Sequence, residues 1–199
     1  MDGLQYRTLG ALETRDAGEN ENPVIEGYFA VFDETYEIYT GYAERIDPRA
    51  FDKSISGDIR ALTDHNTAKV LGRTKAGTLD LRVDDHGLFG TISVNPNDRE
   101  AMDLYARVKR GDVNQCSFGF VIDEARDDYR KDGSVLTTIT DLTLFEVSVC
   151  TFPAYESTEV TARAKDAHEN ALKGWRESMR ARLTDGGENI TEKETPDNA

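Results

Sequence analysis

The sequence is poor in basic residues and in long apolar runs, and each shortage excludes a class of protein. Its 199 residues carry 38 acidic against 24 basic side chains, which gives a net charge of −14. Because nucleic-acid binding requires Lys and Arg to neutralise phosphates, this balance argues against a nucleic-acid partner and against anionic membranes. No stretch approaches the roughly 18 consecutive apolar residues of a membrane span, and the first residues lack a secretory-signal pattern.

Cysteine is also scarce, since only Cys116 and Cys150 occur, each inside an apolar run. Neither belongs to a paired-cysteine cluster, so the sequence predicts no structural zinc site and indicates no cofactor. Two free buried thiols fit a reducing compartment. The acidic stretch around Asp127, Asp128 and Asp132 lacks the spacing of a calcium loop. We therefore expect a soluble, cytosolic chain that is not secreted and binds no metal.

What the sequence does contain is a succession of short segments rich in β-branched and aromatic residues. They predict six to eight strands, with a short helix after Asp47-Pro48 and a longer one that Asn97 or Asp98 caps and Gly111 ends. Short antiparallel strands need closure or covering to hide their edges. We expect a mainly β, α+β domain, built as a closed or nearly closed antiparallel barrel with peripheral helices.

The chain is expected to divide near residue 160. Residues 1–160 contain the strand segments and form the predicted domain, whereas residues 161–199 are weakly amphipathic and then acidic and polar. Such a composition cannot bury enough apolar surface to form a core, so a helical extension followed by a disordered tail is predicted.

The central strand candidate, residues 114–122, has two different faces. Alternation places Cys116 and Phe118 on an apolar face and Ser117 and Gly119 on the other. Gly119 leaves open space beside the Ser117 hydroxyl, where a substrate backbone could approach. The alternative is a strand serine whose hydroxyl is satisfied locally.

Two further side chains carry candidate chemistry. His65 ends a predicted strand, whereas His86 lies in a polar turn and His168 in the C-terminal extension. Glu146 lies within an apolar run, where a carboxylate must be paired or hydrogen-bonded; by alternation it shares a face with Leu142, Leu144 and Ser148. It could reach solvent, pair with an arginine, or orient an imidazole.

A serine, a histidine and a carboxylate form the set that nucleophilic hydrolysis requires. The imidazole takes the hydroxyl proton, and the carboxylate fixes the imidazole tautomer. Asp64 and Asp141 are the alternative carboxylates to Glu146. Cys116 with His65 would give a cysteine hydrolase, but alternation puts Cys116 and Ser117 on opposite faces, so His65 can serve only one of them.

Several short segments, in order along residues 24–160, resemble the tailed-phage prohead (capsid maturation) protease family, serine peptidases with a herpesvirus assemblin-like fold. They are GYFAVFD at 27–33, YAERIDPRAF at 42–51, LTDHN at 62–66, LGRT at 71–74, GLFG at 87–90, VKRGDV at 108–113, CSFGF at 116–120 and LFEVSVCTFPAY at 144–155. By this resemblance Ser117 is the nucleophile, His65 the general base and Glu146 the third member of the triad.

The resemblance also implies a biological role. Such serine endopeptidases act inside the procapsid in the host cytoplasm, and they cleave the scaffold protein, or the scaffolding domain of the major capsid protein, and themselves. Residues from about 159 onward would then be a targeting or self-cleaved tail, and a homodimer is expected by analogy with assemblin-type enzymes. The competing interpretation is a non-catalytic capsid or scaffold component that kept the protease fold.

Overall fold

The computed structural model describes residues 5–16, 18, 22–32 and 34–152. Its elements, in chain order, are β1 (Gln5–Arg15), β2 (Val24–Val31), β3 (Tyr36–Tyr39), β4 (Tyr42–Ile46), the 3-10 helix η1 (Pro48–Phe51), β5 (Arg60–Thr63), β6 (Asn66–Arg73), the 3-10 helix η2 (Thr74–Ala76), β7 (Leu79–Val83), β8 (Gly87–Ser93), α1 (Arg99–Arg110), β9 (Gln115–Tyr129) and β10 (Val135–Cys150). The expected mainly β architecture is confirmed. The predicted tail at 161–199 lies outside the described residues, and no described helix is long and apolar enough to cross a membrane.

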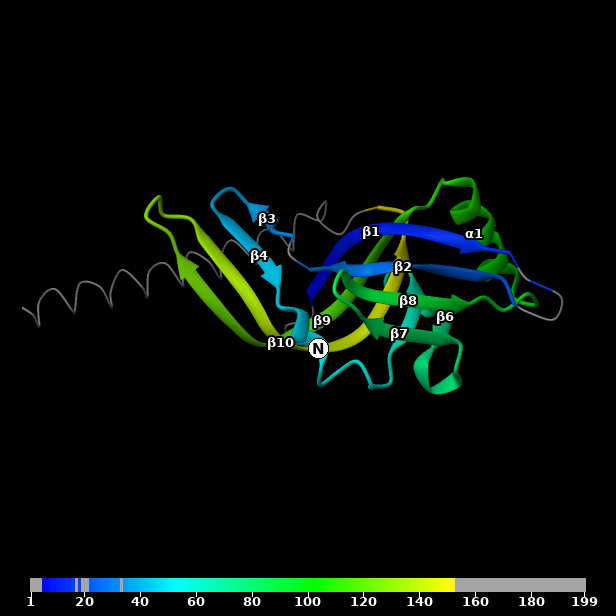
Figure 1. Ribbon diagram of the computed structural model, residues 1–199. Coiled ribbons are helices and arrows are strands. Elements are labelled where there is room, and N and C mark those ends of the chain that lie inside the picture. The colour runs from blue at the N-terminus through cyan, green and yellow to red at the C-terminus, as the bar shows by residue number, and fades with distance from the viewer. Residues whose placement is uncertain (1–4, 17, 19–21, 33, 153–199) are drawn as a thin grey trace, which may run out of the picture. The chain divides into compact units, whose positions relative to one another are not determined.

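The strands form one sheet with the order β3-β4-β10-β9-β1-β2-β8-β7, and β5 branches from β10 and carries β6 (Figure 1). The described part of the chain holds ten strands, more than the six to eight predicted. The barrel is not confirmed, since this path runs open from β3 to β7 and β6 pairs only with β5.

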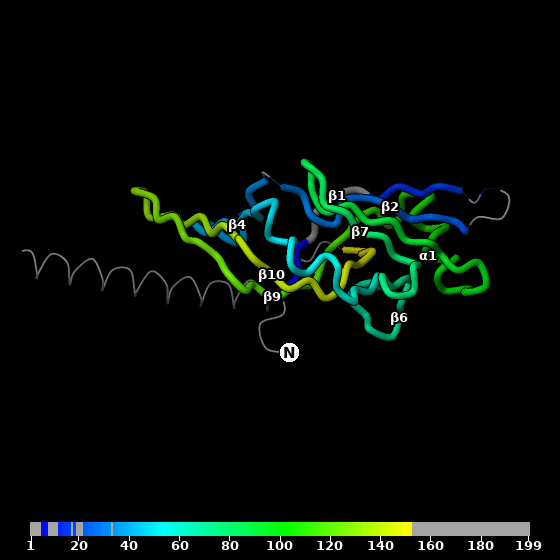
Figure 2. Tube along the Cα trace, turned by 60° about the horizontal axis from the view of Figure 1, so that its bottom comes forward, coloured from blue at the N-terminus to red at the C-terminus, as the bar shows by residue number. Residues whose placement is uncertain are grey.

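Strands β9 and β10 are the longest pair, and they lie side by side along their whole lengths (Figures 1 and 2). Residues 135–150 form the single strand β10. Strand β9 continues through the polar residues around Asp127 to Tyr129, because their polar side chains are exposed and cost nothing there. The turn follows, with Gly133 at φ 86°.

Strand β10 also has parallel neighbours, so the sheet is not purely antiparallel as expected. Its first part pairs with β4 from Val135 to Ile139, and its last part pairs with β5 from Glu146 to Val149. Strand β10 therefore lies beside both β4 and β5, the strand that leads into His65. Parallel pairing of this kind requires long connections. In the sequence β5–β9 lie between β4 and β10, and β6–β9 lie between β5 and β10.

The hydrophobic core covers the apolar face of β9 predicted from alternation. Cys116, Phe118 and Phe120 are fully buried and belong to the main core cluster. Helix α1 closes over this core with an apolar stripe of four buried residues, Ala101, Leu104, Tyr105 and Val108. Asp98 caps the helix by accepting a hydrogen bond from the Ala101 amide, and Gly111 ends it at φ 86°, as predicted.

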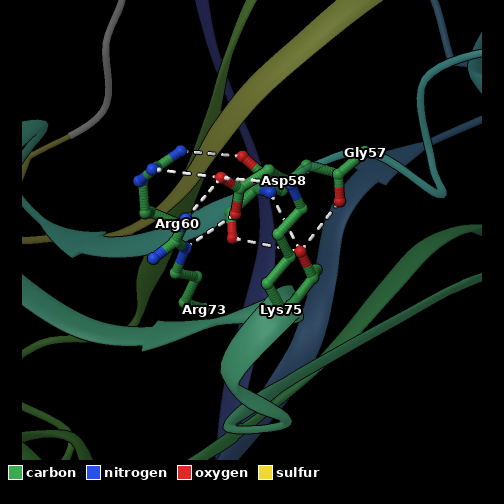
Figure 3. A network of polar contacts seen from close by, with 7 residues as sticks. Gly57, Asp58, Arg60, Arg73 and Lys75 are labelled. Atoms are coloured by element: carbon green, nitrogen blue, oxygen red, sulfur yellow. Dashed lines mark hydrogen bonds and ion pairs between the residues drawn. The ribbon is translucent and has the colours of Figure 1, made fainter.

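A network of charged groups anchors the base of the β5–β6 hairpin (Figure 3). The Asp58 carboxylate accepts hydrogen bonds from Arg73 Nε at 2.7 Å and Nη2 at 2.6 Å, and Arg60 Nη2 lies 3.3 Å away. Lys75 Nζ is 4.0 Å from the same carboxylate. The Arg73 guanidinium holds the pKa of Asp58 down, at about 2. The anchor ties the start of β5 to the end of β6, and the opposite end of this hairpin carries His65.

Candidate active site

His65 lies in the tight turn between β5 and β6, not at a strand end as predicted. Thr63 pairs with Asn66 across the turn, so Asp64 and His65 are its two central residues. Both have left-handed backbone conformations, with φ 48° at Asp64 and φ 57° at His65. That conformation costs about 1–2 kcal/mol for each non-glycine residue, so the surrounding structure must hold the turn in place.

Contacts from β10 and the residue after it stabilise this strained turn. The Asp64 carboxylate accepts hydrogen bonds from Thr151, 2.7 Å from its amide and 3.2 Å from its hydroxyl. The Asp64 amide donates to the carbonyl of Val149 at 3.0 Å. The His65 amide donates to Ser148 Oγ at 3.2 Å. These hydrogen bonds fix the backbone of the turn, and with it the point from which the His65 imidazole extends.

Glu146 is the carboxylate that contacts this imidazole, with Oε1 2.7 Å from Nδ1 of His65. It is only 7% exposed. Its position depends on a β-bulge, because Leu144 pairs with Phe120 and Glu146 with the next residue, Gly119. Phe145 is the extra residue. The prediction that Glu146 shares a face with Leu142 and Leu144 is therefore wrong, whereas its sharing a face with Ser148 agrees with the register.

The Ser148 hydroxyl, which was not among the predicted site residues, connects these two groups. It is fully buried, donates to Glu146 Oε2 at 2.5 Å and accepts from the His65 amide. One hydroxyl thus fixes both the carboxylate and the histidine backbone. Its spacing of two residues from Glu146 was the available signal, because residues i and i+2 share a face of a strand.

Ser117 lies on β9 directly opposite Ser148 of β10, on the face away from the core, as alternation predicted. Its hydroxyl is fully buried and donates to the carbonyl of Arg7 on β1 at 2.8 Å. The expected open space beside it is absent. A Cβ at Gly119 would overlap Glu146 Oε1 and lie 3.0 Å from the Tyr6 ring, so the missing side chain makes room for these two groups.

The two thiols differ in their relation to His65. Cys116 faces the core and donates to the Tyr28 carbonyl at 2.8 Å, and burial raises its pKa well above the usual range. Cys150 Sγ lies 3.7 Å from Nε2 of His65. Burial, with the nearby charges of Asp64 and Glu146, raises the pKa of the Cys150 thiol to about 12. Both sulfurs therefore remain protonated near neutral pH, which disfavours a thiolate nucleophile.

The remaining candidates are bound elsewhere. Asp141 forms an ion pair with Lys53, and the Asp64 carboxylate accepts a hydrogen bond from the Thr151 amide, so neither contacts the imidazole. The His86 ring packs edge-on against Tyr28, and His168 lies outside the described residues. Within the described ranges no group of three or more His, Cys, Asp or Glu side chains is arranged to hold a metal ion.

The arrangement thus joins His65 to Glu146, while Ser117 lies on the strand next to Glu146 with its hydroxyl directed to β1. Imidazole Nδ1 faces a buried carboxylate, which leaves Nε2 as the nitrogen that can take a proton. In the structure Nε2 of His65 faces the Cys150 sulfur. The described residues thus place an imidazole against a buried carboxylate, with a buried hydroxyl on the adjoining strand.

Comparisons with known proteins point to one group of proteins. A family model described as caudovirus prohead serine protease matches residues 10–173. The prohead protease of Enterobacteria phage HK97 is 31% identical over 156 residues, which cover 75% of this chain and 64% of the relative. The chain therefore aligns with less than two thirds of that relative's length. The solved bacteriophage T4 capsid assembly protease shows 14% identity and a TM-score of 0.48, over 74% of this chain and 96% of that one.

Proposed function

The chain belongs to the caudovirus prohead serine protease family, and on that premise we propose that it is a serine endopeptidase of capsid maturation. Ser117 is the nucleophile, His65 the general base and Glu146 the group that orients the imidazole. The observation that carries this proposal is the 2.7 Å contact between His65 Nδ1 and Glu146 Oε1. His65 makes this contact from a strained turn that neighbouring groups hold in place.

In the proposed reaction His65 Nε2 takes the proton of the Ser117 hydroxyl as Ser117 Oγ attacks a peptide carbonyl. The imidazolium that forms is stabilised by Glu146, and it then protonates the leaving amine. The acyl-enzyme is hydrolysed by water in the reverse sequence of proton transfers. For the first step the Ser117 hydroxyl must exchange its present acceptor, the Arg7 carbonyl, for His65 Nε2.

The proposed substrates are the scaffold protein or the scaffolding domain of the major capsid protein, together with the chain itself. The proposed location is the interior of the procapsid in the host cytoplasm. The acidic balance of the chain supports a protein rather than a nucleic-acid partner. The homodimer and the self-cleaved tail remain predictions.

A non-catalytic capsid component is the second candidate, because a fully buried Ser117 hydroxyl bonded to a carbonyl would suit a chain that kept only the fold. Mass spectrometry of the purified chain and its Ser117→Ala variant, each co-expressed with the capsid protein, separates the two. We expect cleavage of the chain and the capsid protein with the native sequence and no cleavage with Ser117→Ala. Equal processing by both would exclude the protease proposal.

A further inference from the structure

Residues 5–8 of β1, here called the β1 arm, cover all three proposed catalytic side chains. The Arg7 carbonyl accepts the Ser117 hydroxyl at 2.8 Å. The Tyr6 ring lies with its centroid 4.0 Å from that of His65. The Tyr6 ring and Glu146 Oε1 both border the space beside Gly119, and burial and the Glu146 charge raise the pKa of Tyr6. A substrate carbonyl cannot reach Ser117 while the arm stays there.

The arm occupies this position as a paired strand. Gln5, Tyr6, Arg7 and Thr8 pair antiparallel with β9, from Phe120 back to Ser117. Addition of an extended chain to a strand beside a nucleophile is also how a protein substrate can be bound, because backbone hydrogen bonds hold any sequence in register. The arm therefore fills the place that an extended substrate would need.

The arm is separable from the rest of β1. A register shift between Thr8 and Ala11 interrupts the pairing with β9, and pairing with β2 begins only at Leu12. Residues 5–8 thus pair with β9, while residues 12–15 pair with β2 in the other half of the sheet. The family model begins at residue 10, so the arm also precedes the region shared with the family.

A buried ion pair fastens the arm. The Arg7 side chain is 2% exposed, and its Nε and Nη2 donate to Glu44 Oε2 on β4 at 2.8 and 2.5 Å. Glu44 is 3% exposed and also accepts from the Tyr42 hydroxyl at 3.1 Å. If Arg7 leaves, a buried carboxylate loses its cation, which is unfavourable unless another cation replaces it.

We propose that the edge of β9 between Ser117 and Phe120 is the binding site of the substrate chain, and that the β1 arm occupies it as an internal pseudosubstrate. The substrate binds there as an antiparallel strand after the arm moves away. It presents Lys or Arg at the position of Arg7, because Glu44 there is a buried carboxylate built to pair with a cation. The inference rests on the proposed function of Ser117.

The test measures how fast an alkyl fluorophosphonate labels Ser117 in the full chain, located by mass spectrometry of tryptic peptides. Glu44→Gln removes the charge that holds Arg7 and keeps the side-chain shape. We expect labelling about tenfold faster than in the native chain, the effect of losing one charge-assisted hydrogen bond. Arg45→Gln is the matched control, since Arg45 is an exposed neighbour on β4 that bonds Thr138, and its labelling rate should not change.

A peptide of residues 5–12 tests the binding site directly. Added to the Glu44→Gln chain it should still slow labelling, because the introduced glutamine keeps an acceptor for the peptide's arginine. In the Arg45→Gln chain the arm still competes for the same site, so the peptide should slow labelling there only to the extent that the arm leaves β9. A peptide with Met in place of Arg7 brings no cation to the buried Glu44 carboxylate. It should therefore compete less well in a chain that has Glu44 than in the Glu44→Gln chain. If Glu44→Gln fails to fold in a thermal melt, Arg7→Met in the full chain serves instead.

The outcomes separate the two proposals. Equal labelling of the native and Glu44→Gln chains, or no protection by the residue 5–12 peptide, overturns the arm proposal and leaves the protease proposal intact. Failure of every chain to label at Ser117, together with native processing by Ser117→Ala, overturns the protease proposal and the arm proposal with it. Faster labelling in Glu44→Gln with protection by the peptide supports both.

Discussion

Each group in the candidate site is held by its neighbours rather than by its own conformational preference. His65 has an unfavourable backbone, Glu146 is a carboxylate within an apolar strand, and Ser148 satisfies both through a single hydroxyl. Removing one member should therefore disturb the others, because a buried polar network fails when it is only partly satisfied.

Gly119→Ala tests how tightly the carboxylate is placed. The added methyl would overlap Glu146 Oε1, so the carboxylate must move away from His65. We expect self-cleavage about a hundredfold slower, the loss typical of a displacement near 1 Å in an active site. Val121→Ala, at the next position on the same face of β9, should cleave at close to the native rate. A native rate in Gly119→Ala would show that Glu146 does not orient the imidazole.

Ser148→Ala tests the hydroxyl that joins Glu146 to the His65 backbone. It leaves one acceptor and one donor unsatisfied in a buried site, so we expect about 1–3 kcal/mol of lost stability in urea unfolding and slower self-cleavage. Ser148→Thr keeps the hydroxyl and should recover most of the cleavage rate. Equal rates in the alanine and threonine variants would contradict a role for this oxygen in positioning the site.

At the scale of elements, the bulge in β10 decides which face of the strand carries Glu146. Leu142 and Leu144 belong to the core, and so do Val147 and Val149, so the inward positions change from even to odd numbers across Phe145. Phe145 is 40% exposed and is not part of the core cluster. The inserted residue, rather than the alternation pattern, brings Glu146 to His65.

Two single-residue deletions test this reading of the bulge. Deleting Phe145 restores regular alternation and keeps Glu146 opposite Gly119, so the chain should fold and retain measurable self-cleavage. Deleting Val147 shifts Ser148 to the core face and should abolish cleavage and lower the Tm. Circular-dichroism melts and mass spectrometry of the purified chains make the comparison. A Val147 deletion milder than the Phe145 deletion would refute this account.

The sequence predicts the elements well where the signal is local and fails where it depends on register. The caps of α1 and the two faces of residues 115–120 follow from neighbouring residues. The bulge at Phe145 and the contact of Arg7 with Ser117 depend on how distant strands align, which no local pattern contains. The predicted open space at Gly119 failed for this reason, because its occupants come from β10 and β1.

For the molecule as a whole, the Asp58 network makes stability depend on pH in a predictable direction. The folded pKa of Asp58 is about 2, below its ordinary value of 3.8, because Arg73 stabilises the carboxylate. Its contribution is therefore complete above pH 3.8 and is lost as the pH falls towards 2.

Asp58→Asn should lower the Tm at pH 7, and its difference from the native chain should shrink as the pH falls through this window. Asp80→Asn, at an exposed position of β7, is the control and should follow the native chain throughout. Thermal unfolding at pH 7, 4 and 2.5 gives the comparison, with broad acid effects common to all three chains. A constant Tm difference between Asp58→Asn and the native chain at every pH would show that the Asp58 charge is not what stabilises the hairpin.

The parallel pairing of β10 with β4 and β5 has a consequence for the time at which the site can exist. His65 and Glu146 are 81 residues apart, and Ser117 and Arg7 are 110 apart. During synthesis a chain that has reached Ser117 still lacks the strand that holds β5 in place, so His65 has neither its carboxylate nor the support of its turn. Contacts this distant also form slowly. The nascent chain therefore remains without its candidate catalytic pair until β10 has been made and docked.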